Sequence, residues 1–323
     1  MTVKDESNDT LVSVKQVRDV LNVYWVLTDY CNFSCPYCPR NLHDGDFFSG
    51  RKPGWPSEAQ IQAFIPRLLA QANGTPINIT LSGGEPTTHP SFKWLAENPD
   101  ILPVSVVTNC SRPLAWWKSL SRLPRTVVVS LHPKFSNVTK INEVVTWLTD
   151  KGVDTYLNLL LDPFMWEKSL SIFEGLNPEL RKSVRPKVIN YQGESEYQGK
   201  DNSYFGKVLP YTKEQRDFIA SFPTVAKPVD EYFLANATKA DGSVIPVIAP
   251  EFIRTGNNAY KGWKCSAGSK GITVSFDGNV YAGICLAKNL GTLESFELEK
   301  EFLTCPKYLC ACPGDLVLTK VKS

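Results

Sequence analysis

Three cysteines near the N-terminus are the residues of this chain best suited to chemistry. They are spaced Cys31-x3-Cys35-x2-Cys38, and the next cysteine, Cys110, stands far downstream. A cubane iron–sulfur cluster is normally held by four thiolates, so a compact trio leaves one iron open to an external ligand. An open coordination position is what distinguishes catalytic from structural metal sites. The trio therefore predicts a reactive iron–sulfur centre.

The segment resembles the signature loop of the radical S-adenosylmethionine (radical SAM) family, in which an aromatic residue, here Tyr37, precedes the third cysteine. The resemblance implies that Cys31, Cys35 and Cys38 hold a [4Fe-4S] cluster whose open iron chelates the amino and carboxylate groups of SAM, with Tyr37 at the cofactor site. It also implies that an electron from the cluster cleaves the sulfonium to a 5′-deoxyadenosyl radical, which abstracts hydrogen from an unactivated C–H bond.

A zinc knuckle or a disulfide pair is the alternative interpretation of the trio. Zinc would require a second C-x2-C or Cys/His pair at a short distance, and the sequence places Cys110 next. The polar start of the chain has no signal-like apolar region, so its nine cysteines are expected to be metal ligands in a reducing compartment, the cytoplasm.

A second motif, Gly83-Gly84-Glu85-Pro86, directly follows an apolar β-branched run. Glycines permit a close approach of backbone to a ligand because no Cβ intervenes, and the carboxylate can accept a hydrogen bond from an ammonium group. The segment resembles the GGEP motif of the same family. The resemblance implies that its backbone and acidic side chain hold the methionine amino group of SAM.

Polar residues at two later strand ends are weaker candidates for cofactor binding. Thr108 and Asn109 end one predicted strand and Ser130 ends the next, at positions similar to those that contact the ribose and carboxylate of SAM in the family. Small polar residues are also common at strand ends for turn reasons. His132 would face the same opening, as a structural hydrogen-bonding residue or a functional one, and Cys110 is either a small buried residue or a chemical participant.

Short apolar runs alternate with amphipathic stretches from Val23 to Asn190, a pattern typical of βα units and a parallel sheet. The expected strands are Val23–Thr28, Ile77–Leu81, Val104–Thr108, Thr126–Leu131, Val153–Leu161 and Val184–Asn190. Six units are too few for an eight-stranded barrel but suit the partial (βα)6 TIM-like barrel of the radical SAM family. The fold class is therefore α/β, with ligands at the carboxyl ends of the strands.

Five further cysteines gather late in the chain, at positions 265, 285, 305, 310 and 312. An expected β-hairpin around Asp277-Gly278 would bring Cys265 and Cys285 to the same end. The region resembles the auxiliary-cluster domain called SPASM or its shorter form, twitch, which implies one auxiliary [4Fe-4S] cluster. Four thiolates complete such a cluster, so one of the five is surplus.

The ligand set that we prefer is Cys265, Cys285, Cys310 and Cys312, with Cys305 as the alternative. The tail spacing Cys305-x4-Cys310-x-Cys312 departs from the C-x2-C-x5-C-x3-C of full SPASM domains, so the ligands within 305–312 remain open. A zinc ribbon in the same tail is the competing interpretation.

We expect four regions: an N-terminal extension at 1–22, the radical SAM partial barrel at 23–190, a linker near the substrate at 191–260 and a twitch-like domain at 261–323. Hydrophobic content of 42%, charged content of 21% and a net charge of +2 are globular values. They favour neither a nucleic-acid partner nor, with no run of about 18 apolar residues, a membrane one.

Together these features predict a radical SAM enzyme, an oxidoreductase in class, that oxidises a small polar metabolite by dehydrogenation or cyclisation, with the auxiliary cluster accepting the second electron. A flavodoxin- or ferredoxin-type protein would supply the first electron, the one that cleaves SAM. A maturase that cross-links or epimerises a ribosomal peptide is one alternative. A non-catalytic iron–sulfur electron-transfer protein is another, although such a carrier would not need the Gly83-Gly84-Glu85-Pro86 segment.

Overall fold

The computed structural model describes residues 11–35, 37–38, 55–101, 104–189, 211–222, 234–310 and 312–322. The chain divides into two compact units. Unit 1 comprises Met1–Trp25, Pro56–Ile79 and Ala226–Ser323, and unit 2 comprises Val26–Trp55 and Thr80–Val225. The division passes through two strands, β2 (Leu21–Thr28) and β3 (Ile77–Gly83). Residues 191–210 and 223–233 of the predicted linker at 191–260 lie outside the described residues.

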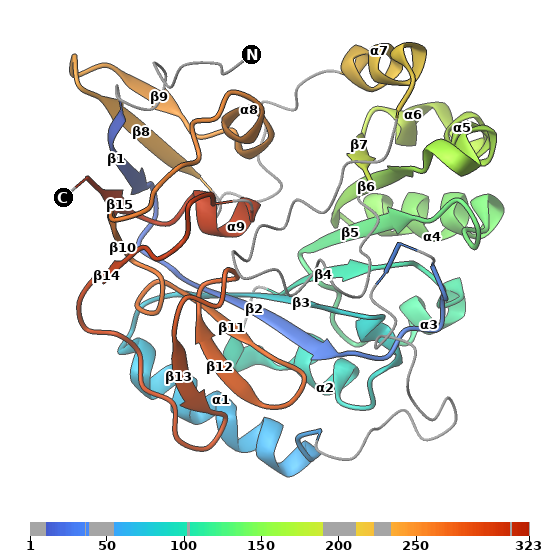
Figure 1. Ribbon diagram of the computed structural model, residues 1–323. Helices are drawn as coiled ribbons and strands as arrows, with labels where there is room; N and C mark the ends of the chain where they lie inside the picture. Colours follow the sequence, from blue (N-terminus) through green and yellow to red (C-terminus); the bar gives the residue numbers. More distant parts are fainter. Residues whose placement is uncertain are drawn as a thin grey trace. The chain divides into compact units, whose positions relative to one another are not determined.

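Unit 2 contains the parallel sheet that the sequence predicts (Figure 1). The ends of β2 and β3 are followed, in chain order across the sheet, by the four strands β4 (Val104–Thr108), β5 (Thr126–Leu131), β6 (Asp154–Leu161) and β7 (Val184–Val188). The pairs β4–β5, β5–β6 and β6–β7 are parallel. All six predicted strands are confirmed, and with them the α/β class of a partial barrel.

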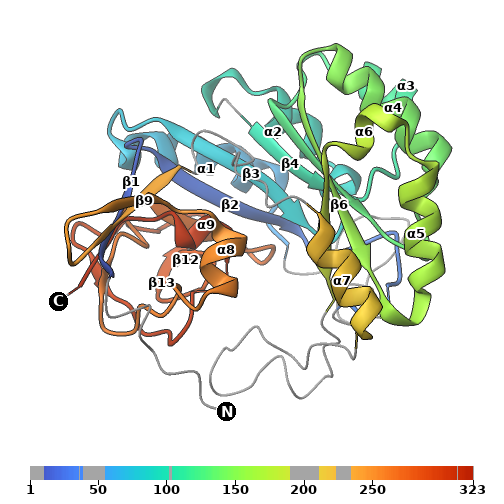
Figure 2. The ribbon, with the colours of Figure 1, turned by 90° about the horizontal axis from the view of Figure 1, so that it is seen from above.

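The described helices of unit 2 connect these strands, except α7, which follows the last of them. They are η2 (Pro86–Thr88), α2 (Phe92–Glu97), η3 (Pro99–Ile101), α3 (Leu114–Lys118), α4 (Val138–Asp150), η4 (Pro163–Met165), α5 (Trp166–Gly175), α6 (Pro178–Arg181) and α7 (Lys213–Ser221). Helices α4 and α5 pack on β6 (Figure 2). Alternate residues of the strands, such as Val129 and Leu159, are buried in one core with Val144 of α4. The other face of these strands is therefore free of this helix layer.

Helix α1 (Glu58–Ala72) contributes buried residues to unit 1. Its N-terminus carries the predicted capping box between Ser57 and Gln60. The predicted hairpin around Asp277-Gly278 is confirmed as β11 (Gly271–Val274) and β12 (Asn279–Ala282). Strand β11 pairs in parallel with the first half of β2, and β13 (Asn289–Thr292) extends the hairpin.

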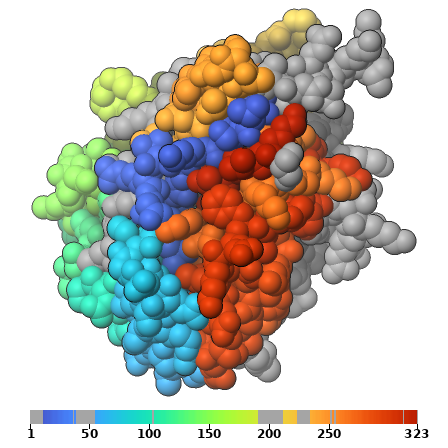
Figure 3. Space-filling view, turned by 90° about the vertical axis from the view of Figure 1, so that its left-hand side faces the viewer, coloured from blue at the N-terminus to red at the C-terminus, as the bar shows by residue number. Residues whose placement is uncertain are grey.

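A second sheet in unit 1 joins the two ends of the chain, and the sequence analysis missed most of it. Its order is β14-β10-β15-β1-β8-β9. The bounds are β1 (Leu11–Gln16), β8 (Ala235–Lys239), β9 (Val244–Pro246), β10 (Lys264–Cys265), β14 (Leu303–Thr304) and β15 (Lys320–Val321). Strand β1, in the segment expected to be an extension, pairs Val14 with Lys320, and the two ends lie together in Figure 3.

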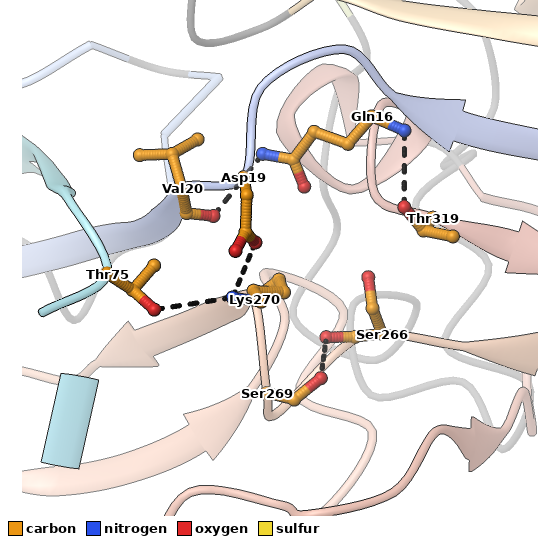
Figure 4. Close-up of polar contacts among 8 residues, drawn as sticks. All are labelled: Gln16, Asp19, Val20, Thr75, Ser266, Ser269, Lys270 and Thr319. Carbon is orange, nitrogen blue, oxygen red and sulfur yellow. Dashed lines mark hydrogen bonds and ion pairs between the residues drawn. The ribbon is translucent and has the colours of Figure 1, made fainter. Parts of the chain in front are cut away.

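The turn between β10 and β11 is fixed by polar contacts within unit 1 (Figure 4). The Lys270 ammonium lies 2.5 Å from the Asp19 carboxylate and donates to Thr75 Oγ1 at 3.4 Å. The Ser269 hydroxyl donates to the Ser266 carbonyl at 3.0 Å. This turn directly follows Cys265, so the contacts help to fix where that thiol lies.

Two short helices complete unit 1, α8 (Ala249–Arg254) and α9 (Pro313–Leu316). None of the helices in the described ranges combines the length and apolar character that a membrane span requires.

Candidate functional site

The loop after β2 brings the three N-terminal cysteines together. The thiols of Cys35 and Cys38 are hydrogen-bonded to each other, and the charge of Cys31 acts on Cys38. The Cys38 amide also donates to the Cys35 carbonyl at 3.1 Å. The Cys31 sulfur accepts from the Phe33 amide at 3.4 Å and from Asn109 Nδ2 at 3.8 Å. Backbone and amide donors thus surround the trio.

The three thiols differ in acidity because of their contacts. The hydrogen bond from Cys38, supported by His132, lowers the pKa of Cys35 to about 5 against the effect of burial. The same hydrogen bond, together with burial, raises the pKa of Cys38. Burial raises the pKa of Cys31 to about 11. Cys35 is therefore the thiol of the trio that most readily provides a thiolate, the form that binds metal.

His132, whose role the sequence leaves open, contacts the trio. Its Nδ1 lies 2.8 Å from the Tyr37 hydroxyl and 3.3 Å from the Cys35 sulfur. Its ring is parallel to that of Tyr37, with centroids 6.0 Å apart, and meets Phe33 edge-on at 5.7 Å. The His132 amide donates to Ser136 Oγ at 2.7 Å. His132 thus holds Tyr37 and Cys35 in place from the end of β5.

The two glycines of the second motif have a packing reason that the sequence analysis did not identify. A Cβ on Gly83 would lie 2.2 Å from the Thr28 carbonyl oxygen, and one on Gly84 would lie 2.0 Å from the Tyr30 carbonyl oxygen. Gly84 donates its amide to Thr28, and Glu85 donates its amide to Tyr30, both at 2.8 Å. Only glycine lets the end of β3 approach the loop that leads to the trio this closely.

Glu85 is fully buried and links the ends of β3 and β4. Its Oε1 accepts from the Thr87 amide and hydroxyl at 3.1 and 2.5 Å and from the Thr108 hydroxyl at 2.7 Å, while Oε2 accepts from the Asn109 amide at 2.6 Å. Burial raises the pKa of Glu85 against these bonds. Because the side chain of Asn109 donates to the Cys31 sulfur, Glu85 positions a residue that contacts the trio. Its predicted bond to SAM remains a prediction.

The remaining predicted residues near the trio occupy different environments. Pro86 opens the 3-10 helix η2. Ser130 is half-buried, in β5. Cys110 is buried, has φ 56° and donates its amide to Thr108 Oγ1 at 3.0 Å, and burial raises its pKa to about 12. Cys110 is therefore a small buried residue of the core.

Asp162, at the end of β6, was not singled out from the sequence. Its side chain is buried, and Oδ1 accepts from the Phe164 amide at 2.9 Å. Oδ2 is buried with no hydrogen-bond partner within the described ranges. Burial, aided by the Asp162 charge, raises the pKa of both Tyr37 and Tyr211, the latter to about 12. The Asp-Pro step after an apolar run was the sequence signal that could have drawn attention to it.

The late cysteines lie together in unit 1. The charge of Cys265 acts on Cys285 and Cys310, and the charge of Cys310 acts on Cys285. Cys312 acts on Cys310, and Cys305 acts on Cys265. Burial is the largest cause that raises the pKa of Cys265, Cys285, Cys310 and Cys312. These five thiols are called the late group below.

A buried aspartate fixes the turn that carries Cys285. The Asp315 carboxylate accepts from the amides of Ile284 at 2.8 Å and Cys285 at 2.7 Å. A Cβ on Gly283, which has φ 68°, would lie 3.1 Å from both carboxylate oxygens and 3.2 Å from the Cys285 sulfur. The turn thus wraps tightly around Asp315.

A buried lysine supplies positive charge to the late group. Lys320 is 1% exposed, and its ammonium donates to the carbonyls of Asp315, Leu316 and Leu318. It also lies 5.0 Å from the centre of the Tyr260 ring. Burial alone would lower the pKa of Lys320, but the charges of nearby thiolates and of Asp315 raise it overall. The ammonium in turn lowers the pKa of Cys265 and Cys310 against the effect of burial.

The donor chemistry of both groups fits an iron–sulfur cluster. Each group is made of thiols, the ligands of such clusters. Within the described ranges, no three or more His, Cys, Asp or Glu side chains converge as a single metal ion requires. Thiols also bind zinc, so a zinc ribbon stays the alternative for the late group.

Comparison with known proteins gives a family match. Residues 25–159 match the family model described as the radical SAM superfamily. The solved structure of hexahistidine-tagged anSMEcpe with bound AdoMet is 15% identical, with TM-score 0.48, and the match covers 85% of this chain and 75% of that one. SuiB of Streptococcus suis bound to precursor peptide SuiA is 14% identical, with TM-score 0.46, and the match covers 85% of this chain and 63% of that one. No curated protein matches.

Proposed function

We propose that this protein is a radical SAM enzyme that binds a [4Fe-4S] cluster through Cys31, Cys35 and Cys38 and cleaves SAM reductively. The proposal is supported by the match of residues 25–159 to the family model of the radical SAM superfamily. When bound, the cluster supplies the electron that converts SAM to methionine and a 5′-deoxyadenosyl radical. The observation that carries the proposal is that the three thiols act on one another and that the Cys31 sulfur contacts Asn109, the residue that Glu85 holds at the end of β4.

Different residues of unit 2 contribute to the proposed cofactor site in different ways. Gly83 and Gly84 allow the end of β3 to lie against the loop of the trio. Glu85, Thr108 and Asn109 form one hydrogen-bonded group beside it. We infer that Glu85, Thr108 and Asn109, together with Tyr37, Pro86 and Ser130, contact SAM. The carboxyl ends of parallel strands are the usual place for ligands in such folds.

We further propose that Cys265, Cys285, Cys310 and Cys312 hold one auxiliary [4Fe-4S] cluster, with Cys305 as the alternative fourth ligand. The mutual influence of these thiols and the buried Lys320 charge support the proposal. A cation close to thiolates reduces the cost of burying their negative charge.

The reaction that this arrangement supports is a net two-electron oxidation. Bound SAM would supply the 5′-deoxyadenosyl radical that takes one hydrogen atom from the substrate and becomes 5′-deoxyadenosine. A cluster held by the late group would accept the electron that the substrate gives up together with a proton, so that the product would be dehydrogenated or cyclised. A flavodoxin- or ferredoxin-type donor supplies the first electron, and nine free cysteines agree with a reducing cytoplasm.

We infer a small polar metabolite as substrate, with a ribosomal peptide as the alternative. The support is chemical, because half-buried Ser130 and Asn158 lie on the face of the sheet opposite the helix layer. Polar side chains on that face suit a substrate with several hydrogen-bonding groups.

The test is anaerobic incubation of the reconstituted protein with SAM and dithionite, with 5′-deoxyadenosine measured by mass spectrometry. The wild type and the control variant Cys110→Ala should produce it, and Cys35→Ala should not. A wild-type protein that holds iron but releases no 5′-deoxyadenosine, with or without trial substrates, would contradict the proposal.

A further inference from the structure

One face of the sheet in unit 2 carries a polar row that extends beyond the proposed cofactor contacts Asn109 and Ser130. Side chains alternate between the two faces of a strand. Val129 and Leu157 belong to the face packed under the helices, so Ser130 and Asn158 belong to the opposite face. Ser130 is the register partner of Asn158, and Asn158 is the partner of Arg185. Three strands therefore place hydrogen-bonding side chains in one line.

The line begins next to the cysteine trio. Thr108 of β4 is paired with Val129 of β5, so the following residue, Asn109, is level with Ser130. Asn109 contacts the Cys31 sulfur. Three strand spacings of about 4.8 Å separate β4 from β7, so the line is about 14 Å long. This is the length of a small metabolite placed beside a cofactor.

The far end of the line is positively charged. Arg185 and Lys187 are two residues apart in β7 and therefore share this face. The Arg185 guanidinium lies over the Tyr156 ring, with its carbon 4.2 Å from the ring centre. Lys187 is the register partner of Leu160 and lies two residues nearer the carboxyl end of the sheet than Arg185. The cationic end thus points toward the edge where ligands bind in parallel α/β folds.

The surroundings of the two cations suit an anion. Lys187 is exposed, yet the protein around it lowers its pKa, and the Arg185 charge lowers it further. Desolvation also lowers the pKa of Arg185. Asp154, an acidic residue near this group, acts on Tyr156 from the amino end of β6. A bound anion would relieve the repulsion between the neighbouring cations.

We propose that Arg185 and Lys187 form a subsite for an anionic group of the substrate, a carboxylate or a phosphate, with Asn158 hydrogen-bonding the part that extends toward the cofactor contacts Ser130 and Asn109. The subsite rests on the proposed function and adds the chemical class of its substrate. Arginine binds either anion with two parallel hydrogen bonds, and lysine adds a point charge.

The first test is lysine footprinting of the anaerobically reconstituted protein with an amine-acetylating reagent and peptide mass mapping. Inorganic phosphate, acetate or SAM is added at ionic strength matched with chloride. Phosphate or acetate should slow acetylation of Lys187 by the factor 1 + [L]/Kd, about threefold at twice the dissociation constant, while Lys151, exposed at the end of α4, is unchanged. The more protective anion identifies the substrate group.

Two outcomes would overturn the subsite. Absence of protection by both anions means that the pair does not bind an anion. Protection by SAM equal to that by phosphate or acetate assigns the pair to the cofactor, not to the substrate. Neither outcome depends on 5′-deoxyadenosine formation, so a failure of the proposed function would be seen separately in the SAM cleavage assay.

The second test uses variants of the exposed lysine. The more protective anion should raise the melting temperature of the wild type and of the control Lys151→Met. The shift should be lost in Lys187→Met and largely kept in Lys187→Arg, which restores the charge. An equal shift in Lys187→Met would place the anion elsewhere and contradict the proposal.

Discussion

The two cysteine groups of this protein are built in different ways. The trio in unit 2 comes from one short loop, and its sulfurs are contacted by groups such as the Phe33 amide, the Asn109 amide and the His132 ring. The late group in unit 1 is assembled from several turns, and buried Lys320 and Asp315 act on its thiols. One group is surrounded by hydrogen-bonding groups of the protein, and the other by charges of opposite sign.

The roles that we propose for the two groups give this difference a physical reason. A site that exchanges a substrate-like ligand needs strand ends and donors that the ligand can reach, and the trio lies among three such strand ends. A site that only accepts and returns an electron can be enclosed, and enclosure of several thiolates requires a cation because isolated buried charges are costly. The comparison predicts that the two sites can be damaged independently.

The largest expected effect comes from the triple variant Cys31→Ala, Cys35→Ala, Cys38→Ala. Two cubanes give roughly eight irons per chain, and the variant should keep about four while it loses SAM cleavage entirely. Iron is measured by colorimetric assay after anaerobic reconstitution, with Cys110→Ala as control. Loss of all iron in the triple variant would show that the late group holds no cluster of its own.

The second effect is on stability. Lys320→Met should remove about 3–5 kcal/mol from the free energy of unfolding, since it leaves the Asp315 charge and three backbone carbonyls without their buried partner. Urea unfolding measures the change. The matched control is Lys264→Met, an exposed lysine on β10 whose ammonium reaches Thr304 Oγ1 at 3.1 Å, and it should change stability by about 0.5 kcal/mol or less. Equal losses of stability in the two variants would show that the buried Lys320 charge does not stabilise the fold.

The third effect concerns the backbone contact beneath the trio. Gly84→Ala places a Cβ 2.0 Å from the Tyr30 carbonyl oxygen, so the loop must shift, at a cost of about 1–3 kcal/mol. The iron held by the trio should fall while that of the late group is unchanged. Gly152→Ala is the control, because its Cβ meets open space at φ 80° and costs about 1–2 kcal/mol from backbone strain alone. Full iron occupancy in Gly84→Ala would contradict this role of the glycine.

The smallest effect distinguishes the two candidate ligands of the late group. Cys312→Ala should lose the iron of that group, whereas Cys305→Ala should retain it. The Cys305 thiol donates to the Lys307 carbonyl at 3.7 Å, and the charge of Cys312 acts on Cys310. The reverse result would make Cys305 the fourth ligand.

Local patterns were sufficient to predict the sheet of unit 2. Most of its strands are rich in apolar and β-branched residues, as in Val127–Val129, and such runs keep their conformation in many contexts. Strand β7 differs, because it carries Arg185 and Lys187 between its two valines. The trio was also visible, because its ligands lie within eight residues of one another. The capping box of α1 and the hairpin of β11 and β12 depend on local residues in the same way.

Long-range contacts explain what the sequence could not predict. Strand β1 is short and gains its partners from β8 and from β15 at the other end of the chain. The burial of Lys320 depends on the late group around it. Nothing in the sequence next to this lysine indicates that its side chain is buried. Glu85 was recognised by its motif, but its bonds to Thr108 and Asn109 join residues more than twenty positions apart.

The central claim, that the chain holds one cluster open to SAM and one closed to it, is tested most directly by electron paramagnetic resonance of the dithionite-reduced protein with and without SAM. The account predicts two signals, of which SAM changes only the one that is absent in the triple cysteine variant. A single signal, or a change in both signals on addition of SAM, would contradict it.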